Sequence, residues 1–489
     1  MCLFLLTAVI FGFCVKQFSE PDIWWHLRYA QDLIQSHTFS PVDTFTFTAA
    51  GSPRPNYEWL SEVPYYFGYR AAGLHGILTV YFCVLVLIYA GVYYLSCTAG
   101  ADCKDATPAT LLGIFLGVVS IGPRTLLFGW LCMVALLFVL DRFRRSGKGI
   151  WMLPPLFALW INLHPLWAFG MVVLCLTIAS GLVEGNWGLI EAAKWERAAL
   201  RKLLTAFVIS IAALFLNPFG YRLVLYPFDF LFRQQSNTQF VEEWQGVDFS
   251  TGNGKLALFV LLGLVALNLL VRRRWRLDEA LLMAFALWAA LSHTRFLFLA
   301  GLIFPPILAP RIHLFPPYEP ELDKPVLNGI IMVGVVLVLW HFFPSNAELQ
   351  KKVEEDYPKA ALEYMQREQM YGRLYNPYSW GGYMEWTAPE FKPFIDSRAD
   401  IFVYNGVLDE VRKVNGLEDP FGVLDKYRID YVLVQRQRPL AYVLNHSTDW
   451  RAVYSDRLAQ VFAREAPANK AQVTPIRAGS PGEGSCCQP

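Results

Sequence analysis

Charge is scarce in this chain of 489 residues: only 17% of them are Asp, Glu, Lys or Arg, against about 25% in a typical soluble domain. Positive and negative charges nearly cancel, which leaves a net charge of +1. Balanced charge provides no basic surface of the kind that nucleic-acid binding needs. Cysteine is absent from the long stretches 18–82 and 176–485, and no cysteine pair has metal-ligand spacing.

Apolar residues are abundant instead, at 55% of the chain, with a mean hydropathy of +0.32. Aromatic residues reach 15%, and they include 16 Trp and 23 Tyr. Trp and Tyr concentrate at the two interfaces of a bilayer, where a ring with one polar edge is favoured. The composition indicates an integral membrane protein.

Eleven apolar runs have about the length that crosses a hydrocarbon core. They cover 2–18, 76–98, 108–122, 125–141, 150–163, 166–183, 203–217, 255–271, 278–293, 296–310 and 326–344. The first run has no basic segment before it and no small-residue cleavage site, so we expect it to be a retained span. The pattern predicts a mainly α, polytopic transmembrane bundle of about eleven spans.

Basic residues collect in three short loops between these runs, at 142–148, 194–202 and 272–276. With eleven spans, all three loops fall on one side, and the excess of Lys and Arg marks that side as cytoplasmic. The N-terminus is then inside. The extracytoplasmic side of the cell (inner) membrane then holds the segments 19–75, 218–254 and everything after 345.

The outer segments contain structure of their own. In 19–75 we expect helices at Ile23–Gln35 and Tyr57–Arg70 and a short strand at Thr44–Thr48. Charged residues return after 345, where we expect a helix over 345–370, another near 405–415 and a buried strand at Asp430–Val434. The predicted domains are a bundle over 1–344, an extracytoplasmic α/β domain over 345–465 and a disordered tail over 466–489.

Polar residues gather at the predicted outer ends of several spans. They are Glu20, Asp22, His26, Glu58, Glu62, Asn162, His164, Glu242, Glu243, His293 and Arg295. Ionisable groups beside a membrane are costly unless they are solvated or used. Because they lie at one face, we expect them to converge on a single cavity between helices.

Several local motifs are distinctive. They are Pro21–Leu27 (PDIWWHL), Phe45–Thr48 (FTFT), Glu58–Glu62 (EWLSE), Trp160–His164 (WINLH), Leu216–Gly220 (LNPFG), Glu243–Trp244, Tyr378–Tyr383 (YSWGGY) and Phe394–Asp400 (FIDSRAD). A first span followed at once by an acidic-x-acidic pair resembles the GT-C superfamily of glycosyltransferases, and the motifs resemble a bacterial branch of it. The resemblance covers roughly residues 1–465.

The resemblance implies an inverting transfer of a sugar from a polyprenyl-phosphate donor to a lipid, glycan or protein acceptor at the outer face of the membrane. In such a reaction, a carboxylate acts as general base on the acceptor hydroxyl, and cations such as Arg hold the leaving phosphate. Asp22 is the candidate base and Glu20 the second carboxylate. The other polar residues are candidate substrate contacts. Glu242 and Glu243 could hold an acceptor or a divalent metal (Mg²⁺ or Mn²⁺), although no cofactor is certain.

Structural alternatives stand beside these roles. Asp22 could cap a helix, His164 could satisfy a turn, and Glu58 with Glu62 could form a solvated helix face. Trp24 and Trp25 are expected to anchor the interface. In the tail domain, Tyr378–Tyr383 either closes over the site or forms a packed turn, and Asp396 with Arg398 forms a salt bridge or an acceptor-facing lip.

Two other functions compete with transfer. A flippase or transporter for lipid-linked glycans usually shows internal repeats and ionisable residues at mid-membrane, whereas the polar residues here lie at one face. A non-catalytic scaffold that binds a glycolipid is compatible with the same carboxylates.

Overall fold

The computed structural model describes residues 1–234, 238, 241–270 and 274–465, without the side chains of 242 and 268–270. Three parts of the sequence predictions therefore lie outside the described residues. They are the tail 466–489, the side chain of Glu242, and Arg272 and Arg273 of the third basic loop.

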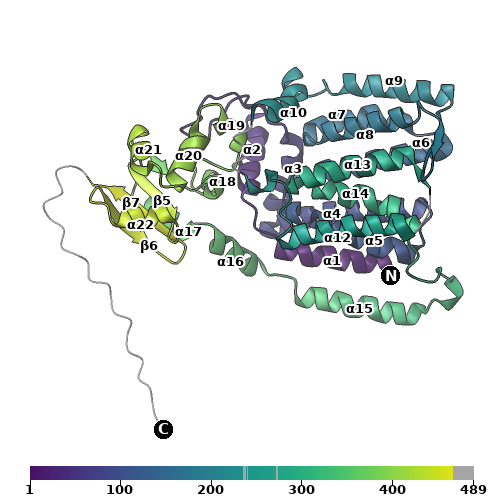
Figure 1. Cartoon of the computed structure of the whole chain (residues 1–489). Coiled ribbons are helices and arrows are strands. Elements are labelled where there is room, and N and C mark those ends of the chain that lie inside the picture. Colours follow the sequence, from purple (N-terminus) through teal and green to yellow (C-terminus); the bar gives the residue numbers. More distant parts are fainter. Residues whose placement is uncertain (235–237, 239–240, 271–273, 466–489) are drawn as a thin grey trace, which may run out of the picture.

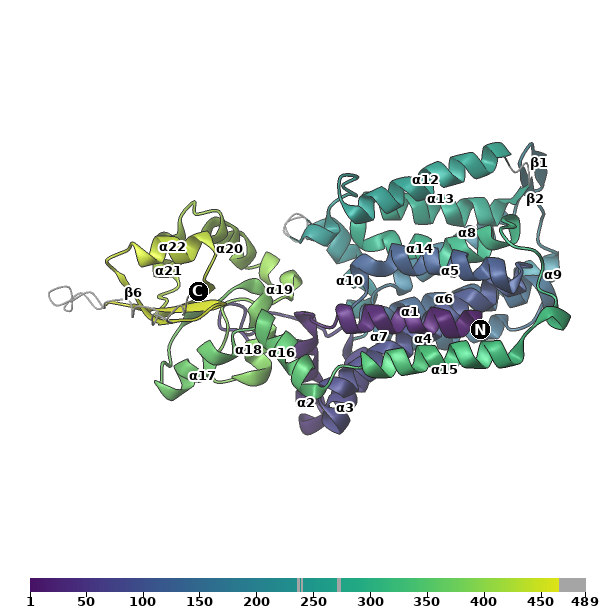
Figure 2. The same ribbon diagram turned by 90° about the horizontal axis from the view of Figure 1, so that it is seen from below.

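A bundle of long helices makes up most of the chain, and these helices run side by side in Figures 1 and 2. Each of the eleven apolar runs coincides with one helix. They are α1 (Cys2–Lys16), α4 (Leu74–Thr98), α5 (Cys103–Gly117), α6 (Leu126–Ser146), α7 (Leu153–Leu163), α8 (Trp167–Ser180), α9 (Arg197–Ala213), α12 (Gly252–Leu270), α13 (Leu277–Ser292), α14 (Leu297–Leu308) and α15 (Pro325–His341).

The predicted number of spans is not confirmed. Among the described residues, α4 and α6 are long and apolar enough to cross a membrane, and the bent pair of α15 with α16 (Asn346–Asp356) could form a third span. The other apolar helices are short; α7, for example, has 11 residues. At about 1.5 Å per residue, such a helix falls well short of a hydrocarbon core about 30 Å thick.

The exposed apolar surface of α15 indicates that lipid surrounds the bundle. The helix has no buried residue, and it runs along the edge of the bundle in both views. Its apolar side chains are widely exposed, as in Ile330 (63%) and Trp340 (80%). A contiguous apolar surface of this kind is not stable in water. The chain is therefore a membrane protein.

Small residues allow the inner helices to approach closely. A Cβ atom on Gly113 of α5 would lie 2.4 Å from the carbonyl oxygen of Gly301 on α14. Close backbone contact through small residues is the usual way in which membrane helices pack, because lipid provides no hydrophobic driving force between them.

The three basic loops meet at one end of the bundle. Arg144 in the first loop pairs with Asp278 after the third, at 2.7 Å, and its guanidinium lies over the ring of Trp195 in the second, at 4.9 Å. A small sheet also joins the second and third loops: β1 (Gly185–Trp187) pairs with β2 (Ile190–Ala192), and β2 pairs with β3 (Trp275–Arg276).

Three further helices lie at the opposite end, namely α2 (Asp22–Ser36), α3 (Trp59–Ala72) and α10 (Tyr221–Arg233). The first two match the helices predicted for the first outer segment. The strand predicted at Thr44–Thr48 is wrong. The amide and the hydroxyl of Thr46 both donate hydrogen bonds to the Asp43 carboxylate, at 3.1 and 2.7 Å. This local side-chain bond replaces strand pairing.

Residues 346–464, here called the C-terminal module, cap this end of the bundle (Figure 1). Besides α16, its elements are α17 (Lys359–Arg367), β4 (Leu374–Tyr375), α18 (Gly381–Thr387), α19 (Ala399–Val403), α20 (Val407–Asn415), α21 (Pro420–Lys426), β5 (Tyr431–Gln435), α22 (Pro439–Asn445), β6 (Trp450–Ser455) and β7 (Ala459–Arg464). The sheet order is β4-β5-β7-β6, with β4 and β5 parallel and the other pairs antiparallel. The expected strand at 430–434 is β5, and the expected helix at 345–370 is broken at Pro358.

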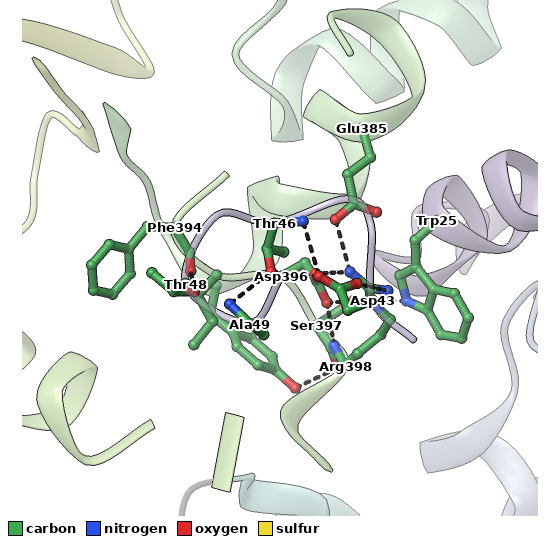
Figure 3. A network of polar contacts seen from close by, with 12 residues as sticks. Trp25, Asp43, Thr46, Thr48, Ala49, Glu385, Phe394, Asp396, Ser397 and Arg398 are labelled. Carbon is green, nitrogen blue, oxygen red and sulfur yellow. Dashed lines mark hydrogen bonds and ion pairs between the residues drawn. The ribbon is translucent and has the colours of Figure 1, made fainter. Parts of the chain in front are cut away.

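A fully buried ion cluster joins the module to the first outer segment (Figure 3). Arg398 pairs with Asp43 at 2.8 Å, with Glu385 at 3.1 Å and with Asp396. We call these four residues the junction. Burial raises the pKa of Glu385 well above its ordinary value. The predicted Asp396–Arg398 salt bridge is thus present, within the core.

Aromatic and glycine residues also pack at the contact between α2 and the C-terminal module. Trp24 and Trp25 are 4% and 3% exposed, so the prediction that they anchor the interface is wrong. The ring of Trp24 contacts that of Tyr383 at 5.1 Å. A Cβ atom on Gly382 would lie 3.2 Å from the Pro21 carbonyl oxygen, which shows how closely α18 packs on the start of α2.

Candidate functional site

Most predicted site residues come together at the end of the bundle beneath the C-terminal module. They arise from separate turns and helix ends: Glu20 follows α1, Asp22 begins α2, His164 ends α7, Glu243 lies in the turn 242–244 and Arg295 in the turn 294–296. The structure groups them into two clusters of ion pairs, and a single cavity shared by them stays a prediction.

The first, here called the arginine cluster, consists of Glu20, Arg124, Glu243 and Arg295. Arg124 donates from Nε to Glu20 at 2.7 Å and binds both carboxylate oxygens of Glu243, at 2.9 and 2.7 Å. Arg295 approaches Glu243 at 3.4 Å. The paired contact of Arg124 with Glu243 is the fork geometry that a guanidinium also uses to bind phosphate.

The two carboxylates of this cluster differ in acidity. Burial raises the pKa of Glu20 to about 7, a shift that Arg124 opposes and the negative charge of Asp22 supports. Burial also acts on Glu243, but Arg124 and Arg295 outweigh it and lower the pKa of Glu243 to about 2. Glu243 therefore stays ionised at neutral pH, whereas Glu20 changes its protonation state near pH 7.

Asp22 lies beside the arginine cluster without belonging to it. It is partly exposed, and it makes no ion pair within the part of the chain that the structure describes. One oxygen accepts from the indole N–H of Trp25 at 3.3 Å, and the same N–H reaches Ser397 of the C-terminal module at 3.2 Å. Pro21 occupies the N-cap of α2, which has no side-chain cap bond, so the capping alternative for Asp22 is wrong.

The second, here called the histidine cluster, consists of His26, Glu58, Glu62 and His164. His26 Nδ1 lies 2.9 Å from Glu62 and its Nε2 lies 3.8 Å from Glu58. His164 Nδ1 accepts from the Leu166 amide at 3.1 Å, so its Nε2 carries the proton and donates to Glu58 at 3.1 Å. His164 therefore orders a turn and contacts the cluster as well.

Burial dominates the titration of this cluster. It raises the pKa of Glu62 and lowers that of His164, which favours the neutral form of each. Burial acts on Glu58 too, but the contacts with His164, His26 and Arg54 together outweigh it and lower the pKa of Glu58 to about 2. Both glutamates are almost completely buried, so the alternative of a solvated helix face is wrong.

Two predicted contacts hold the framework instead. Asn162 accepts from the Trp59 indole at 2.9 Å and donates to the carbonyl oxygens of Ala158 and Leu216, at 2.8 and 2.9 Å, so its amide is fully used within the protein. The Nδ1 of His293 lies 2.7 Å from the Trp244 carbonyl oxygen. Their roles as substrate contacts remain predictions.

Sequence reasoning missed two arginines. Arg124 lies in the turn before α6. The one signal for it in the sequence is its position, because it is a basic residue at the predicted outer end of a span, whereas most basic residues lie in the three loops at the other end. Arg54 is 1% exposed, and its three guanidinium nitrogens have no hydrogen-bond partner. Its guanidinium lies 4.7 and 5.1 Å from the ring centres of Trp25 and Tyr29. Nothing near Arg54 in the sequence indicates this environment.

The residues present do not fit a divalent metal. Among the described residues, no group of three or more His, Cys, Asp and Glu side chains has the arrangement to hold one. Glu243 faces two arginines, which would repel a cation. The predicted Mg²⁺ or Mn²⁺ stays a prediction.

Comparison with known proteins gives matches in structure only. No protein-family model matches the chain, and no curated protein matches it. Two solved structures from Archaeoglobus fulgidus are similar to it: the archaeal oligosaccharyltransferase AglB in complex with an inhibitory peptide and a dolichol-phosphate (TM-score 0.47), and an oligosaccharyltransferase in the apo form (TM-score 0.49). Each is 12% identical, and each match covers 88% of this chain and 69% of the other.

At these TM-scores, both below 0.5, the likeness transfers no residue role to this chain.

Proposed function

We propose that this protein is a GT-C-type membrane glycosyltransferase. It transfers a hexosyl or pentosyl group from a polyprenyl-phosphate-linked donor to a lipid, glycan or protein acceptor at the outer face of the membrane. The observation that carries the proposal is a carboxylate without an ion pair, Asp22, near Arg124, which binds the anionic group of Glu243 in the fork geometry of a phosphate contact.

In the proposed reaction, Asp22 accepts the proton of an acceptor hydroxyl, whose oxygen then bonds to the anomeric carbon of the sugar. The bond from that carbon to the phosphate oxygen breaks, and the polyprenyl phosphate leaves with the electron pair. Asp22 suits the base because it makes no direct ion pair among the described residues and because the Trp25 indole orients one oxygen. Glu20 is held by Arg124 and serves as the second carboxylate.

Arg124 and Arg295 suit the leaving phosphate. Glu243 occupies both of them in the free protein, and the donor phosphate takes its place as their anionic partner. Donor binding thus exchanges one anion for another at the same two guanidinium groups.

The histidine cluster suits a supporting role. His164 holds Glu58 ionised, and Glu58 and Glu62 flank His26 on the helix that begins with Asp22. These contacts set the angle between α2 and α3 and so the position of the base. His26, Glu58, Glu62 and His164 are therefore proposed to position the site beside the substrate.

The orientation in the membrane is part of the proposal. The end with the basic loops faces the cytoplasm, and the C-terminal module lies outside it, in line with the positive-inside rule. A reporter that is active only outside the cytoplasm should be active when it is fused after Arg464 and silent when it is fused at Gly147. The opposite pattern would overturn both the orientation and an outer-face site.

The direct test replaces Asp22 with Asn, which keeps the size and the contact with Trp25 but removes the proton acceptor. Transfer from a polyprenyl-phosphate-linked sugar should fall by roughly 10²-fold or more, the usual scale of general base catalysis. Donor binding and yield of purified protein should not change. Transfer within a few-fold of wild type would show that Asp22 is not the base.

A further inference from the structure

A groove lies next to the proposed site at the same end of the bundle. Its volume is about 410 Å³, and its walls come from the second half of α2, the loop after it, Trp59 and Phe219. This volume falls in the range of about 300–1,000 Å³ that is typical of small-ligand sites. The predicted site does not include this groove.

Aromatic rings form one wall of the groove. Phe39 contacts Trp59 and Phe219 edge to face, with ring centres 5.1 and 5.7 Å apart. Phe39 is 39% exposed, although a lone phenyl ring gains nothing from water. The indole N–H of Trp59 is held by Asn162, which fixes the plane of this ring.

Most of the remaining lining is polar, although Leu33 and Phe45 are apolar. It includes Asp32, Gln35, Thr38 and Asn56, and no Lys, Arg or His is among the lining residues. Asp32 pairs with Arg28 at 3.1 Å, so Arg28 already has an anionic partner. Fixed aromatic rings that face a rim of hydroxyl, amide and carboxylate groups match a neutral sugar, which has an apolar C–H face and hydrogen-bonding hydroxyls.

A second cavity of this protein has an apolar lining and can be compared with the groove. It measures about 340 Å³ and lies between α4, α6 and α7, with a lining of apolar side chains such as Leu131, Val134 and Phe138. The groove beside α2 is unlike it, because seven or more of its lining residues carry polar side chains. The comparison argues against an acyl or prenyl chain in the groove.

One face of α2 connects the groove to the proposed base. Asp22, Trp25, Tyr29, Asp32 and Ser36 are spaced by three or four residues, which places them on one face of the helix. The last three line the groove. At about 1.5 Å per residue, Asp32 lies about 15 Å along the helix from Asp22.

Arg54 lies along the same face of α2. Its guanidinium is over the rings of Trp25 and Tyr29, between the base and the groove, and its N–H groups have no hydrogen-bond partner. Arg54 is 1% exposed and does not line the groove. It therefore supports the rings of Trp25 and Tyr29 from behind instead of contacting a ligand in the groove.

We propose that this groove binds a neutral oligosaccharide, which is the acceptor of the transfer. The non-reducing end of the chain or another hydroxyl-bearing unit extends along α2 to Asp22, while the remaining sugar units lie on Phe39 and Trp59. The inference rests on the proposed function and narrows its acceptor from lipid, glycan or protein to glycan.

The test uses the full chain purified in detergent and a panel of neutral tetrasaccharides, namely maltotetraose, cellotetraose, mannotetraose and chitotetraose, with sialyllactose as an acidic arm. Wild type should bind at least one neutral member and not the acidic one. Phe39→Ala and Asp32→Asn should each weaken this binding at least tenfold, and Phe39→Trp should retain it. Phe421→Ala is the matched control, because Phe421 is an equally exposed ring on α21, far from the groove.

Asp22→Asn separates this inference from the proposed function. It should bind the tetrasaccharide within twofold of wild type while losing transfer. If the tetrasaccharide binds and Asp22→Asn still transfers sugar, the base is wrong and the groove stands. Absence of binding to every neutral member, or binding that both groove variants leave unchanged, would overturn the groove as a glycan site.

Discussion

The junction and the arginine cluster both surround an arginine with carboxylates, yet they differ in access to solvent. The side chain of Arg398 is 0% exposed and pairs with three carboxyl groups in the core. The side chain of Arg124 is 16% exposed, and its partners lie beside the unpaired carboxylate of Asp22. A sealed cluster can only hold parts together, whereas a cluster open to ligand can exchange partners.

The largest effect should come from breaking the junction. Arg398→Ala leaves buried carboxylates without a cation, and such a loss costs about 3–5 kcal/mol. The midpoint of thermal or denaturant unfolding of the full chain in detergent should fall accordingly. Arg367→Ala is the control, because its pair with Glu368 is exposed and worth about 0–1 kcal/mol. Equal destabilisation by both variants would mean that burial does not distinguish these clusters.

Substitutions in the arginine cluster should have a smaller effect, on phosphate affinity. Substitution of Glu243 and of Arg124 should change this affinity in opposite directions. Glu243→Gln removes the anion that competes for Arg124 and Arg295, so affinity for a short-chain polyprenyl phosphate should rise about tenfold, or about 1.4 kcal/mol. Arg124→Gln should lower this affinity by at least as much. Binding of the polyprenyl alcohol, which lacks the phosphate, should change in neither variant. Weaker phosphate binding by Glu243→Gln would assign Glu243 to direct substrate contact.

The smallest effect is on the pH dependence of stability, to which the two glutamates that Arg124 binds should contribute with opposite signs. The pKa of Glu20, raised to about 7 mainly by burial, lies above its unfolded value, so the folded state holds a proton that the unfolded state has released. Stability should therefore fall as pH rises from about 4.5 to 7. Glu243, whose pKa is lowered to about 2, should instead contribute stability above pH 4.5 that is lost in stronger acid.

Glu20→Gln should make the decline in Tm between pH 4.5 and 7 shallower than in the wild type and leave the loss in stronger acid. The decline does not vanish, because the pKa values of Glu62 and Glu385 are raised as well. Thermal unfolding of the wild type and the variant over this pH range provides the measurement. A decline of unchanged slope in Glu20→Gln would show that Glu20 does not contribute to it.

Most helices of this protein were predictable because each depends on a contiguous stretch. The eleven apolar runs became helices, since apolar side chains in lipid leave the backbone to satisfy its own hydrogen bonds. The number of spans was less accessible, because composition does not show where a helix ends relative to the bilayer. The predicted strand at 44–48 failed for a similar reason, as Asp43 bonds to Thr46 in place of a partner strand.

The carboxylates and histidines of the site could be named from their positions at span ends, but their partners could not. Arg124 binds Glu20 and Glu243 across 104 and 119 residues of sequence. The burial of Glu58 and Glu62, and of Trp24 and Trp25, follows from the C-terminal module and the neighbouring helices that cover them. Amphipathic spacing alone is the same for a solvated helix face and for one that another domain covers.

By itself, the sequence determined that this is a membrane protein of apolar helices with polar groups at one face and a charged C-terminal part, because composition and run length decide which solvent a segment prefers. Only the tertiary structure decided that Asp22 stays unpaired while Arg124 takes two carboxylates, that Arg398 closes the junction, and that a groove follows α2. These features depend on which side chains meet, and contacts between residues a hundred positions apart are fixed by the packing of whole helices.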